Sequence, residues 1–149
     1  MFALNLPVFE YKIRQQEGKS KIFDPLRHKF VALTPEEWVR QHFVNYLIKD
    51  RHFPAGRLSN ECNIQLNGLK RRCDTVLYDE YLKPLVIIEY KAPEVQITQT
   101  VFNQIATYNM ALKVKYLIVS NGLKHYCCRM DYEKQKVDYL EAIPDYSAL

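Results

Sequence analysis

The feature that most constrains this chain is an apolar run that ends abruptly in charged residues. Val86 to Ile88 are all apolar, and Glu89 and Lys91 follow almost at once. An uninterrupted apolar run of this kind is typical of a strand that is covered on both faces. The sequence therefore predicts a central strand of a layered α/β domain, with two charged side chains at its end.

A second acid is predicted to lie beside this strand end, because the preceding residues form the other half of a hairpin. Residues 74–78 read as a strand, polar residues 79–83 are typical of a turn, and residues 84–91 form the next strand. Paired residues of an antiparallel hairpin lie equally far from the centre of the turn. We therefore expect Asp74 to lie opposite Glu89, with their Cβ atoms about 5 Å apart.

Asp74, Glu89 and Lys91 are thus predicted to form one cluster. Side chains alternate along a strand, so Glu89 and Lys91 project from the same face. Two carboxylates at this distance repel each other unless a cation lies between them. Two acids and an ammonium group together suit the binding of a divalent metal and a phosphate.

Length and composition favour a single folded domain over residues 1–149. Apolar residues make up 48% of the chain, which is not typical of disordered proteins, and the length allows a sizeable core. No apolar stretch approaches the roughly 18 residues that span a bilayer. The N-terminus does not resemble a signal peptide, and no P-loop motif is present. We therefore expect a cytoplasmic protein that does not enter a membrane, with its four cysteines reduced.

Three consecutive basic residues precede the first acid of the cluster. They are Lys70, Arg71 and Arg72, in a chain whose formal net charge is +4. That net charge permits a nucleic-acid partner but does not require one. Taken alone, the basic run is typical of a solvated turn. Next to a predicted metal site, contact with DNA phosphates is the better interpretation.

A helix is predicted to begin at Thr34 and to end near Asp50. Thr34 is suited to the N-cap, Pro35 to the first helical position, and Glu37 to closing a capping box. The predicted apolar face of this helix consists of Val39, Phe43, Tyr46 and Leu47.

The other segments complete an α/β sandwich around a mixed sheet. Residues 1–33 form an N-terminal extension with a β-hairpin. Its strands are predicted at residues 8–14 and 21–23, followed by a connector over residues 24–30. A second helix is predicted over residues 98–112. Its core side is expected to consist of Val101, Ile105, Tyr108 and Leu112. A strand at residues 60–66 precedes the hairpin, and strands at residues 116–120 and 124–130 follow the second helix. Residues 131–149 form a tail, in which residues 137–143 can add another strand.

Five segments match a pattern that is known from one group of proteins. They are Pro35 to Gln41, Lys70 to Asp74, Val86 to Pro93, Gln104 to Tyr108 and Val119 to Gly122. Together they resemble the PD-(D/E)XK nuclease superfamily, and specifically the nuclease-like domain at the N-terminus of type I restriction enzyme R subunits. The resemblance covers a core of about residues 34–130. It implies a restriction-endonuclease-like αβββαβ fold, with a mixed central sheet flanked by helices.

The resemblance also implies hydrolysis of DNA phosphodiester bonds with Mg²⁺, for which Mn²⁺ can substitute. Carried over by position, Asp74 and Glu89 bind the metal and Lys91 is the catalytic lysine. The backbone carbonyl of Tyr90 would complete the protein ligands. Lys91 would position the attacking water or stabilise charge on the phosphate. The plain structural alternatives are a solvated Lys91 and an Asp74 that is ion-paired with the preceding arginines.

Three further residues are placed in or near the site by the same resemblance. Gln104 and Tyr108 match an accessory Gln-x-x-x-Tyr motif and lie one helical turn apart. Glu36 matches an acidic residue of the first helix and is predicted to lie closer than Glu37 to the apolar face. The structural alternatives are that Tyr108 lies at the edge of the core and that Gln104 is solvated. Glu36 could stand at the helix N-terminus only because the helix dipole favours an acid there.

The expected partner is DNA, and three functions are consistent with the sequence. The first is a metal-dependent endonuclease of the restriction type. Type I R subunits carry a translocase that is not found in this sequence. We therefore expect the domain to act in one of three ways: alone, together with a separate translocase or specificity subunit, or as a homodimer. The second is a DNA-binding or assembly module with the same fold but without turnover. The third is a small hydrolase unrelated to nucleic acid.

Overall fold

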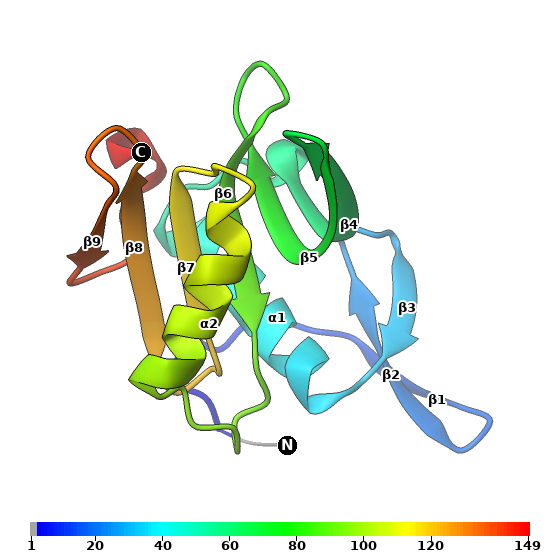
Figure 1. The fold of residues 1–149 in the computed structure, drawn as a ribbon. Coiled ribbons are helices and arrows are strands. Elements are labelled where there is room, and N and C mark those ends of the chain that lie inside the picture. The colour runs from blue at the N-terminus through cyan, green and yellow to red at the C-terminus, as the bar shows by residue number, and fades with distance from the viewer. Residues whose placement is uncertain (1–2) are drawn as a thin grey trace.

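The computed structural model describes residues 3–149. Figure 1 shows a large sheet with one helix on each face and a smaller sheet at one side. In chain order the strands and α-helices are β1 (Ile13–Gln16), β2 (Lys19–Asp24), β3 (Lys29–Ala32), α1 (Pro35–Asp50), β4 (Leu58–Leu66), β5 (Leu69–Tyr78), β6 (Pro84–Tyr90), α2 (Gln99–Met110), β7 (Tyr116–Ser120), β8 (His125–Asp131) and β9 (Lys136–Leu140).

The large sheet is mixed, as predicted. Its six strands lie in the order β4-β5-β6-β7-β8-β9, and only the pair β6 and β7 is parallel. A parallel pair needs a crossover connection, which α2 provides. The predicted order of a helix, three strands, a helix and a strand is therefore confirmed, with β8 and β9 extending the sheet.

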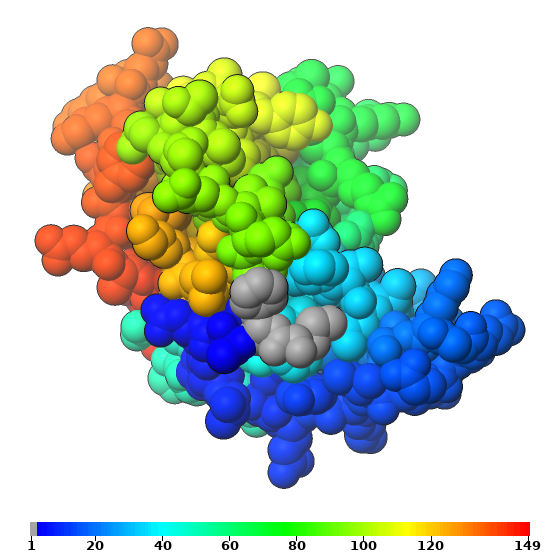
Figure 2. All heavy atoms as spheres, turned by 90° about the horizontal axis from the view of Figure 1, so that it is seen from below, coloured from blue at the N-terminus to red at the C-terminus, as the bar shows by residue number. Residues whose placement is uncertain are grey.

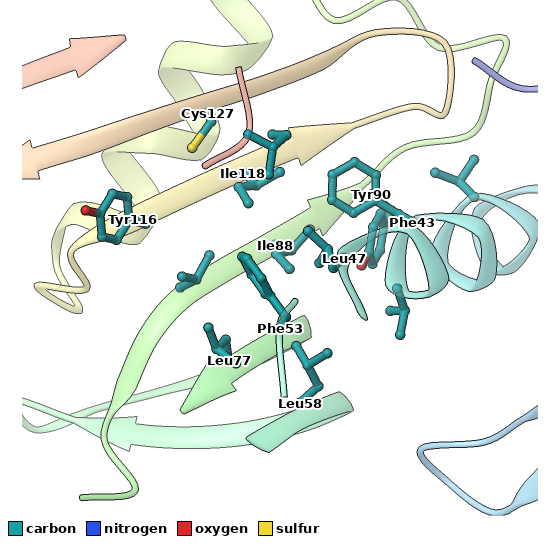
Figure 3. Packing of buried hydrophobic residues seen from close by; sticks show 14 residues of the cluster. Phe43, Leu47, Phe53, Leu58, Leu77, Ile88, Tyr90, Tyr116, Ile118 and Cys127 are labelled. Atoms are coloured by element: carbon teal, nitrogen blue, oxygen red, sulfur yellow. The ribbon is translucent and has the colours of Figure 1, made fainter. Parts of the chain in front are cut away.

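Strand β6 is buried on both faces of this sheet. Val86 and Ile88 belong to the apolar cluster on the side of α1, whereas Ile87 belongs to the cluster on the side of α2. All three side chains are fully buried. Figure 3 shows Ile88 packed with Phe43 and its neighbours in the first cluster. The apolar run from Val86 to Ile88 thus lies in a central strand, as its composition predicts.

Helix α1 begins as the sequence predicts. Thr34 is the N-cap, and its side-chain oxygen accepts a hydrogen bond from the backbone N–H of Glu37 at 3.1 Å. The capping box is not closed by Glu37, because its carboxylate instead accepts hydrogen bonds from Arg27 and Gln41. The predicted apolar face is confirmed for Val39, Phe43 and Leu47, which are buried, and for Tyr46, which is partly buried.

The N-terminal segment explains why α1 is buried on more than its apolar face. The Phe9 ring lies 4.8 Å from the His42 ring, and the Tyr11 ring lies 5.1 Å from that of Trp38. Figure 2 shows the blue N-terminal residues running across this end of the molecule beside the cyan helix. Polar residues of α1 are therefore covered by the extension, which sequence periodicity does not reveal.

Three predictions about the strands are wrong. The strand predicted at residues 8–14 begins only at Ile13 and continues to Gln16. The predicted connector over residues 24–30 contains the beginning of β3, so the N-terminal extension is a three-stranded antiparallel sheet rather than a hairpin. Phe30 of β3 pairs with Phe23 of β2, and the packing of their rings favours this third strand. Strand β5 begins at Leu69, several residues earlier than predicted, so the basic run lies within the strand.

The core side of α2 also differs from the prediction. The buried residues of this helix are Phe102, Ala106 and Asn109, whereas Tyr108 is 52% exposed. The helix packs on the sheet through the stripe that contains Phe102, and this orientation turns Tyr108 toward β5, where its ring meets Arg71. Leu112 is buried as predicted, but it follows the helix.

The cysteines and the two α-helices of residues 3–149 bear on the expectations about thiols and membrane spans. All four cysteines are free, as predicted for reduced thiols. Neither α-helix in this part of the chain is long and apolar enough to cross a membrane.

A test of how the N-terminal segment is anchored compares two glycines with positive φ. Gly122 has φ +85°, and a Cβ there would meet Leu4 Cδ2 at 2.7 Å, whereas Gly68 has φ +77° and open space around it. Both Gly→Ala changes incur a left-handed backbone cost of about 1–2 kcal/mol. We expect Gly122→Ala to cost roughly 1 kcal/mol more because Leu4 must move. Urea unfolding measures both, and equal losses would contradict this anchoring contact.

Candidate active site

The two predicted acids lie next to each other at the ends of β5 and β6. Thr75 pairs with Ile88 in the observed register, so the next pair along the strands is Asp74 with Glu89. The two carboxyl groups are close enough for the charge of Asp74 to raise the pKa of Glu89. The backbone N–H of Tyr90 donates to Asp74 Oδ2 at 2.9 Å. The hairpin prediction is confirmed as far as the pair Thr75 and Ile88, and the acids lie next to each other just beyond that pair.

Glu89 is held in a state that opposes its ionisation. Burial is the largest cause, followed by the negative charge of Asp74. Lys91 and Arg40 partly offset these effects, and the pKa of Glu89 is raised to about 9. Two adjacent carboxylates without a cation between them behave in this way because one must keep a proton.

A hollow beside the acids brings together half of the predicted site residues. Its volume is about 280 Å³, and its lining consists of Arg72, Glu89, Lys91, Gln104, Ile105, Tyr108 and Asn109. Glu89 and Lys91 therefore share a face, as strand alternation predicts. The accessory pair Gln104 and Tyr108 comes from α2 and lines the same space.

A second hollow of about 410 Å³ lies on the side of α1. Asp74, Tyr90, Glu36 and Arg72 are among its lining residues. Arg72 lines both hollows, so it marks the boundary between them. The predicted residues are thus distributed over two adjoining spaces, with the acid pair between them.

The first turn of α1 buries Glu37 and leaves Glu36 exposed. Glu37 is 5% exposed, whereas Glu36 is exposed and only lines the second hollow. Proximity to the apolar face, which helical rotation gives to Glu36, therefore does not decide which of the two glutamates is buried. The physical reason is that Arg27 and Arg40 form ion pairs with the Glu37 carboxylate.

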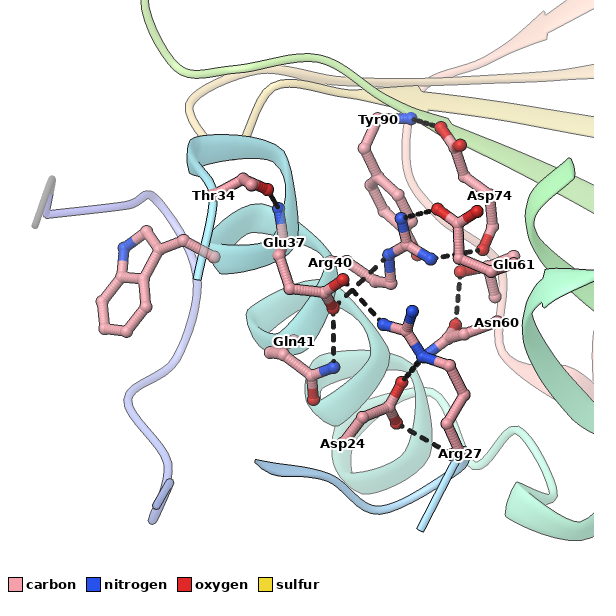
Figure 4. Close-up of polar contacts among 12 residues, drawn as sticks. Asp24, Arg27, Thr34, Glu37, Arg40, Gln41, Asn60, Glu61, Asp74 and Tyr90 are labelled. Atoms are coloured by element: carbon pink, nitrogen blue, oxygen red, sulfur yellow. Dashed lines mark hydrogen bonds and ion pairs between the residues drawn. The ribbon is translucent and has the colours of Figure 1, made fainter. Parts of the chain in front are cut away.

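A buried arginine of α1, Arg40, joins the helix to β4 and β5. It donates to the backbone carbonyl of Asp74 at 3.1 Å, and it forms ion pairs with Glu61 of β4 and Glu37 (Figure 4). Sequence reasoning missed Arg40 and Glu61. The one local signal was that Glu37 and Arg40 are three residues apart and share a helix face.

The same polar network reaches the small N-terminal sheet. Asp24, at the end of β2, forms an ion pair with Arg27 and accepts a hydrogen bond from Asn60 at 3.0 Å. Asn60 in turn accepts a hydrogen bond from the hydroxyl of Thr75 at 2.7 Å. The N-terminal extension therefore supports β5 at the residue that follows Asp74.

Glu61 occupies an unusual position in β4. Its φ is +51°, which is uncommon for a residue other than glycine. Burial opposes its ionisation, but the hydrogen bonds and charges of Arg40 and then Arg72 lower its pKa. Because Arg72 pairs with Glu61 at 2.6 Å, it is not the ion-pair partner of Asp74. This arrangement argues against the alternative in which Asp74 serves only as a partner for Arg72.

The remaining basic residues lie on the outer part of β5. Lys70 is exposed, and the Arg71 guanidinium lies 4.1 Å from the centre of the Tyr108 ring. A third hollow, of about 560 Å³, is lined by Asn63, Ile64, Gln65, Lys70, Arg71 and Arg72. The basic run thus leads from the outer surface of the hairpin to the hollow that contains Lys91.

The acid pair is the set of groups best suited to a divalent metal. Within residues 3–149, no cluster of three or more His, Cys, Asp and Glu side chains could hold a metal ion. Mg²⁺, however, is commonly held by one or two carboxylates together with water and substrate phosphate. Asp74 and Glu89, with the nearby backbone of Tyr90, fit that kind of site.

Comparison with known proteins gives the family. Residues 35–144 match the family described as "Type I restriction enzyme R protein N terminus", which is more than half of the chain. The chain belongs to this family. The match begins at the first residue of α1 and continues past β9, so it includes all the candidate residues of the site.

A solved structure supports the fold of this R-protein N-terminal domain. It is a fragment described as an HsdR subunit of a type I restriction enzyme from Vibrio vulnificus YJ016, with a TM-score of 0.50 and 19% sequence identity. The similarity covers 75% of this chain but only 24% of the fragment, so the chain spans about a quarter of that structure. No curated protein matches the sequence significantly.

We expect Arg40 to be the most costly member of the polar network to remove. Arg40→Met leaves Glu37 and Glu61 without their buried partner, and such losses typically cost about 3–5 kcal/mol. Arg72→Met removes the exposed partner of Glu61 and should cost within about 1 kcal/mol. Urea unfolding of the two variants measures the difference. Equal losses would mean that Arg40 is not the connection on which the strands depend.

The acid pair predicts a pH dependence of stability in protein treated with a chelator. The folded state keeps a proton on Glu89 that the unfolded chain releases above its ordinary pKa of 4.5. The unfolded state then binds fewer protons, so the free energy of unfolding should fall as pH rises from about 4.5 through about 9. Thermal melts across this range should show a smaller fall for Glu89→Gln.

The exposed Glu133 provides the control for this experiment. Glu133→Gln should leave the pH dependence as in the unaltered chain, because its side chain is not part of the acid pair. Parallel curves for Glu89→Gln and the unaltered chain would show that Glu89 does not carry the extra proton.

Proposed function

We propose that this domain is a metal-dependent DNA endonuclease of the restriction type, with a PD-(D/E)XK active site. The observation that carries the proposal is the pairing of Asp74 with Glu89 beside the hollow that Lys91 also lines. Membership of the R-protein N-terminal family supports a role related to restriction. Two neighbouring carboxyl groups oppose each other's ionisation, and a divalent cation between them would remove this cost.

Mg²⁺, with Mn²⁺ as a substitute, would be held by Asp74, Glu89 and the backbone carbonyl of Tyr90. The Tyr90 N–H points toward Asp74, and the N–H and C=O groups of one strand residue point toward the same neighbouring strand. This geometry favours the Tyr90 carbonyl as a third protein ligand. When bound, the ion supplies Lewis-acid polarisation of a phosphoryl oxygen and lowers the pKa of a coordinated water.

Lys91 would act on the phosphate itself. Its ammonium group lines the same hollow as Glu89, so a phosphodiester near the acids would lie within its reach. There it would orient the attacking water or stabilise the negative charge that develops on the phosphate oxygens. Gln104 would assist through its side-chain amide, which can donate to a phosphate oxygen or to the water.

The DNA backbone would reach the site along the basic residues of β5. Lys70, Arg71 and Arg72 lead toward the hollow, and contacts of this kind position a duplex without reading its sequence. Glu36 lines the adjoining hollow, where it would complete the site from α1. A translocase or specificity subunit, or a second copy of the chain, would provide the additional parts for cutting both strands.

A second candidate function is a DNA-binding or assembly module without turnover. It is favoured by one observation: within the described part of the chain, no third acid joins Asp74 and Glu89. Glu61, the acid on the neighbouring strand, is instead occupied by Arg40 and Arg72. In this case metal and DNA would bind to the site, but the DNA would remain intact.

Plasmid nicking with Mg²⁺ or Mn²⁺ distinguishes the two functions. We expect the unaltered chain to nick supercoiled DNA, and Asp74→Asn, Glu89→Gln and Lys91→Ala each to lower the rate at least about a hundredfold. Lys134→Ala, at an exposed position away from the hollows, should nick as the unaltered chain does. Metal-dependent DNA binding without nicking would instead support the second function. Full activity in Lys91→Ala would exclude the proposed mechanism.

A further inference from the structure

Arg71 and Tyr108 form a contact between β5 and α2 that the fold alone does not require. The Arg71 guanidinium lies 4.1 Å from the centre of the Tyr108 ring, which is within the range of a cation–π interaction. The ring is 52% exposed, so Tyr108 is not needed to fill the core. A large aromatic side chain is therefore kept at the surface, where it supports a positive charge.

Arg71 lacks the anionic partner that the other arginines near the acid pair have. Among residues 3–149 it forms no ion pair, and its one hydrogen bond is a 3.3 Å contact from Nη1 to the backbone carbonyl of Lys70. Its Nε is buried without a hydrogen-bond partner. Arg40 and Arg72, in contrast, both form ion pairs with Glu61.

A half-buried guanidinium without a counter-ion is suited to receive an anion. Desolvating a cation is costly unless it is paired, and Arg presents five donors in a planar fork that matches phosphate geometry. Stacking on an aromatic ring leaves the edge of this fork free for such hydrogen bonds. The contact therefore limits the orientations of Arg71. Because Nε is buried and Nη1 donates to Lys70, Nη2 is the donor best placed to reach an anion.

The position of the contact indicates which anion it would receive. Arg71 lines the outer hollow on β4 and β5, and Tyr108 lines the inner hollow that contains Glu89 and Lys91. A chain of phosphates that enters the inner hollow from the outer one must pass this pair. A polyanion with regularly spaced phosphates fits this path better than a single small anion does.

We propose that Tyr108 is a positioning residue whose ring holds Arg71 in place to bind a phosphate of the DNA backbone next to the active site. This inference rests on the proposed function, and it assigns the role to the aromatic ring rather than to the phenolic hydroxyl. Arg71 is the residue that contacts DNA. Tyr108 acts through it, by limiting the rotamers of a long and flexible side chain.

The experiment measures binding of a short random-sequence DNA duplex by fluorescence anisotropy, with Ca²⁺ in place of Mg²⁺ and a series of salt concentrations. Tyr108→Phe keeps the ring and should bind as the unaltered chain does. Tyr108→Leu should raise the Kd about fivefold, which corresponds to the loss of one cation–π contact. Arg71→Gln should lower the slope of log K against log salt by about 0.9, as expected for one lost phosphate contact.

Arg72 provides the matched control, because it is a neighbouring arginine held by Glu61 instead of by Tyr108. Adding Tyr108→Leu to Arg71→Gln should weaken binding no further. Adding it to Arg72→Gln should still raise the Kd about fivefold. Thermal melts confirm that each variant is folded, which is expected because all three side chains are partly or largely exposed.

Three results would overturn the inference while leaving the nuclease proposal intact. They are unchanged binding by Tyr108→Leu, weakening by Tyr108→Phe as large as by Tyr108→Leu, and additive effects of Tyr108→Leu and Arg71→Gln. Failure of the unaltered chain to bind the duplex in a salt-sensitive way would remove both proposals together.

Discussion

The structure around the acid pair depends on one buried guanidinium. Arg40 connects the first turns of α1 with β4 through Glu61 and with β5 through the carbonyl of Asp74. Because a buried charge is tolerated only when its donors are matched, this set of contacts specifies one relative placement of a helix and two strands. The site is thus positioned by an ionic network as well as by the apolar core, and each of them constrains the other.

Much of the fold can be predicted because its main signals are local. The apolar run of β6 requires cover on both faces, and Thr34 with Pro35 defines the start of α1 within a few residues of sequence. The third strand of the small sheet and the orientation of α2 could not be predicted in this way. The third strand depends on its pairing with β2, and the orientation of α2 depends on the packing of Phe102 against distant residues of the sheet.

The candidate site likewise contains one part that local sequence predicts and another that depends on distant contacts. The pairing of Asp74 with Glu89 follows from the arithmetic of one hairpin, so sequence alone places these two residues together. The partner of Arg40 on β4 and the burial of Glu37 instead of Glu36 come from contacts between segments far apart in the chain. A helical wheel places Glu36 nearer the apolar face than Glu37, because it contains no information about Arg27 between β2 and β3.

The small N-terminal sheet supplies contacts that the rest of the molecule would lose if the chain were shortened. Asp24 and Arg27 supply partners to Asn60 and Glu37, which are buried. A shortened chain that starts at α1 would contain the whole segment shared with its family, yet these interior polar groups would lose their partners. The extension is therefore an integral part of the folding unit, and domain boundaries taken from family similarity alone would cut through it.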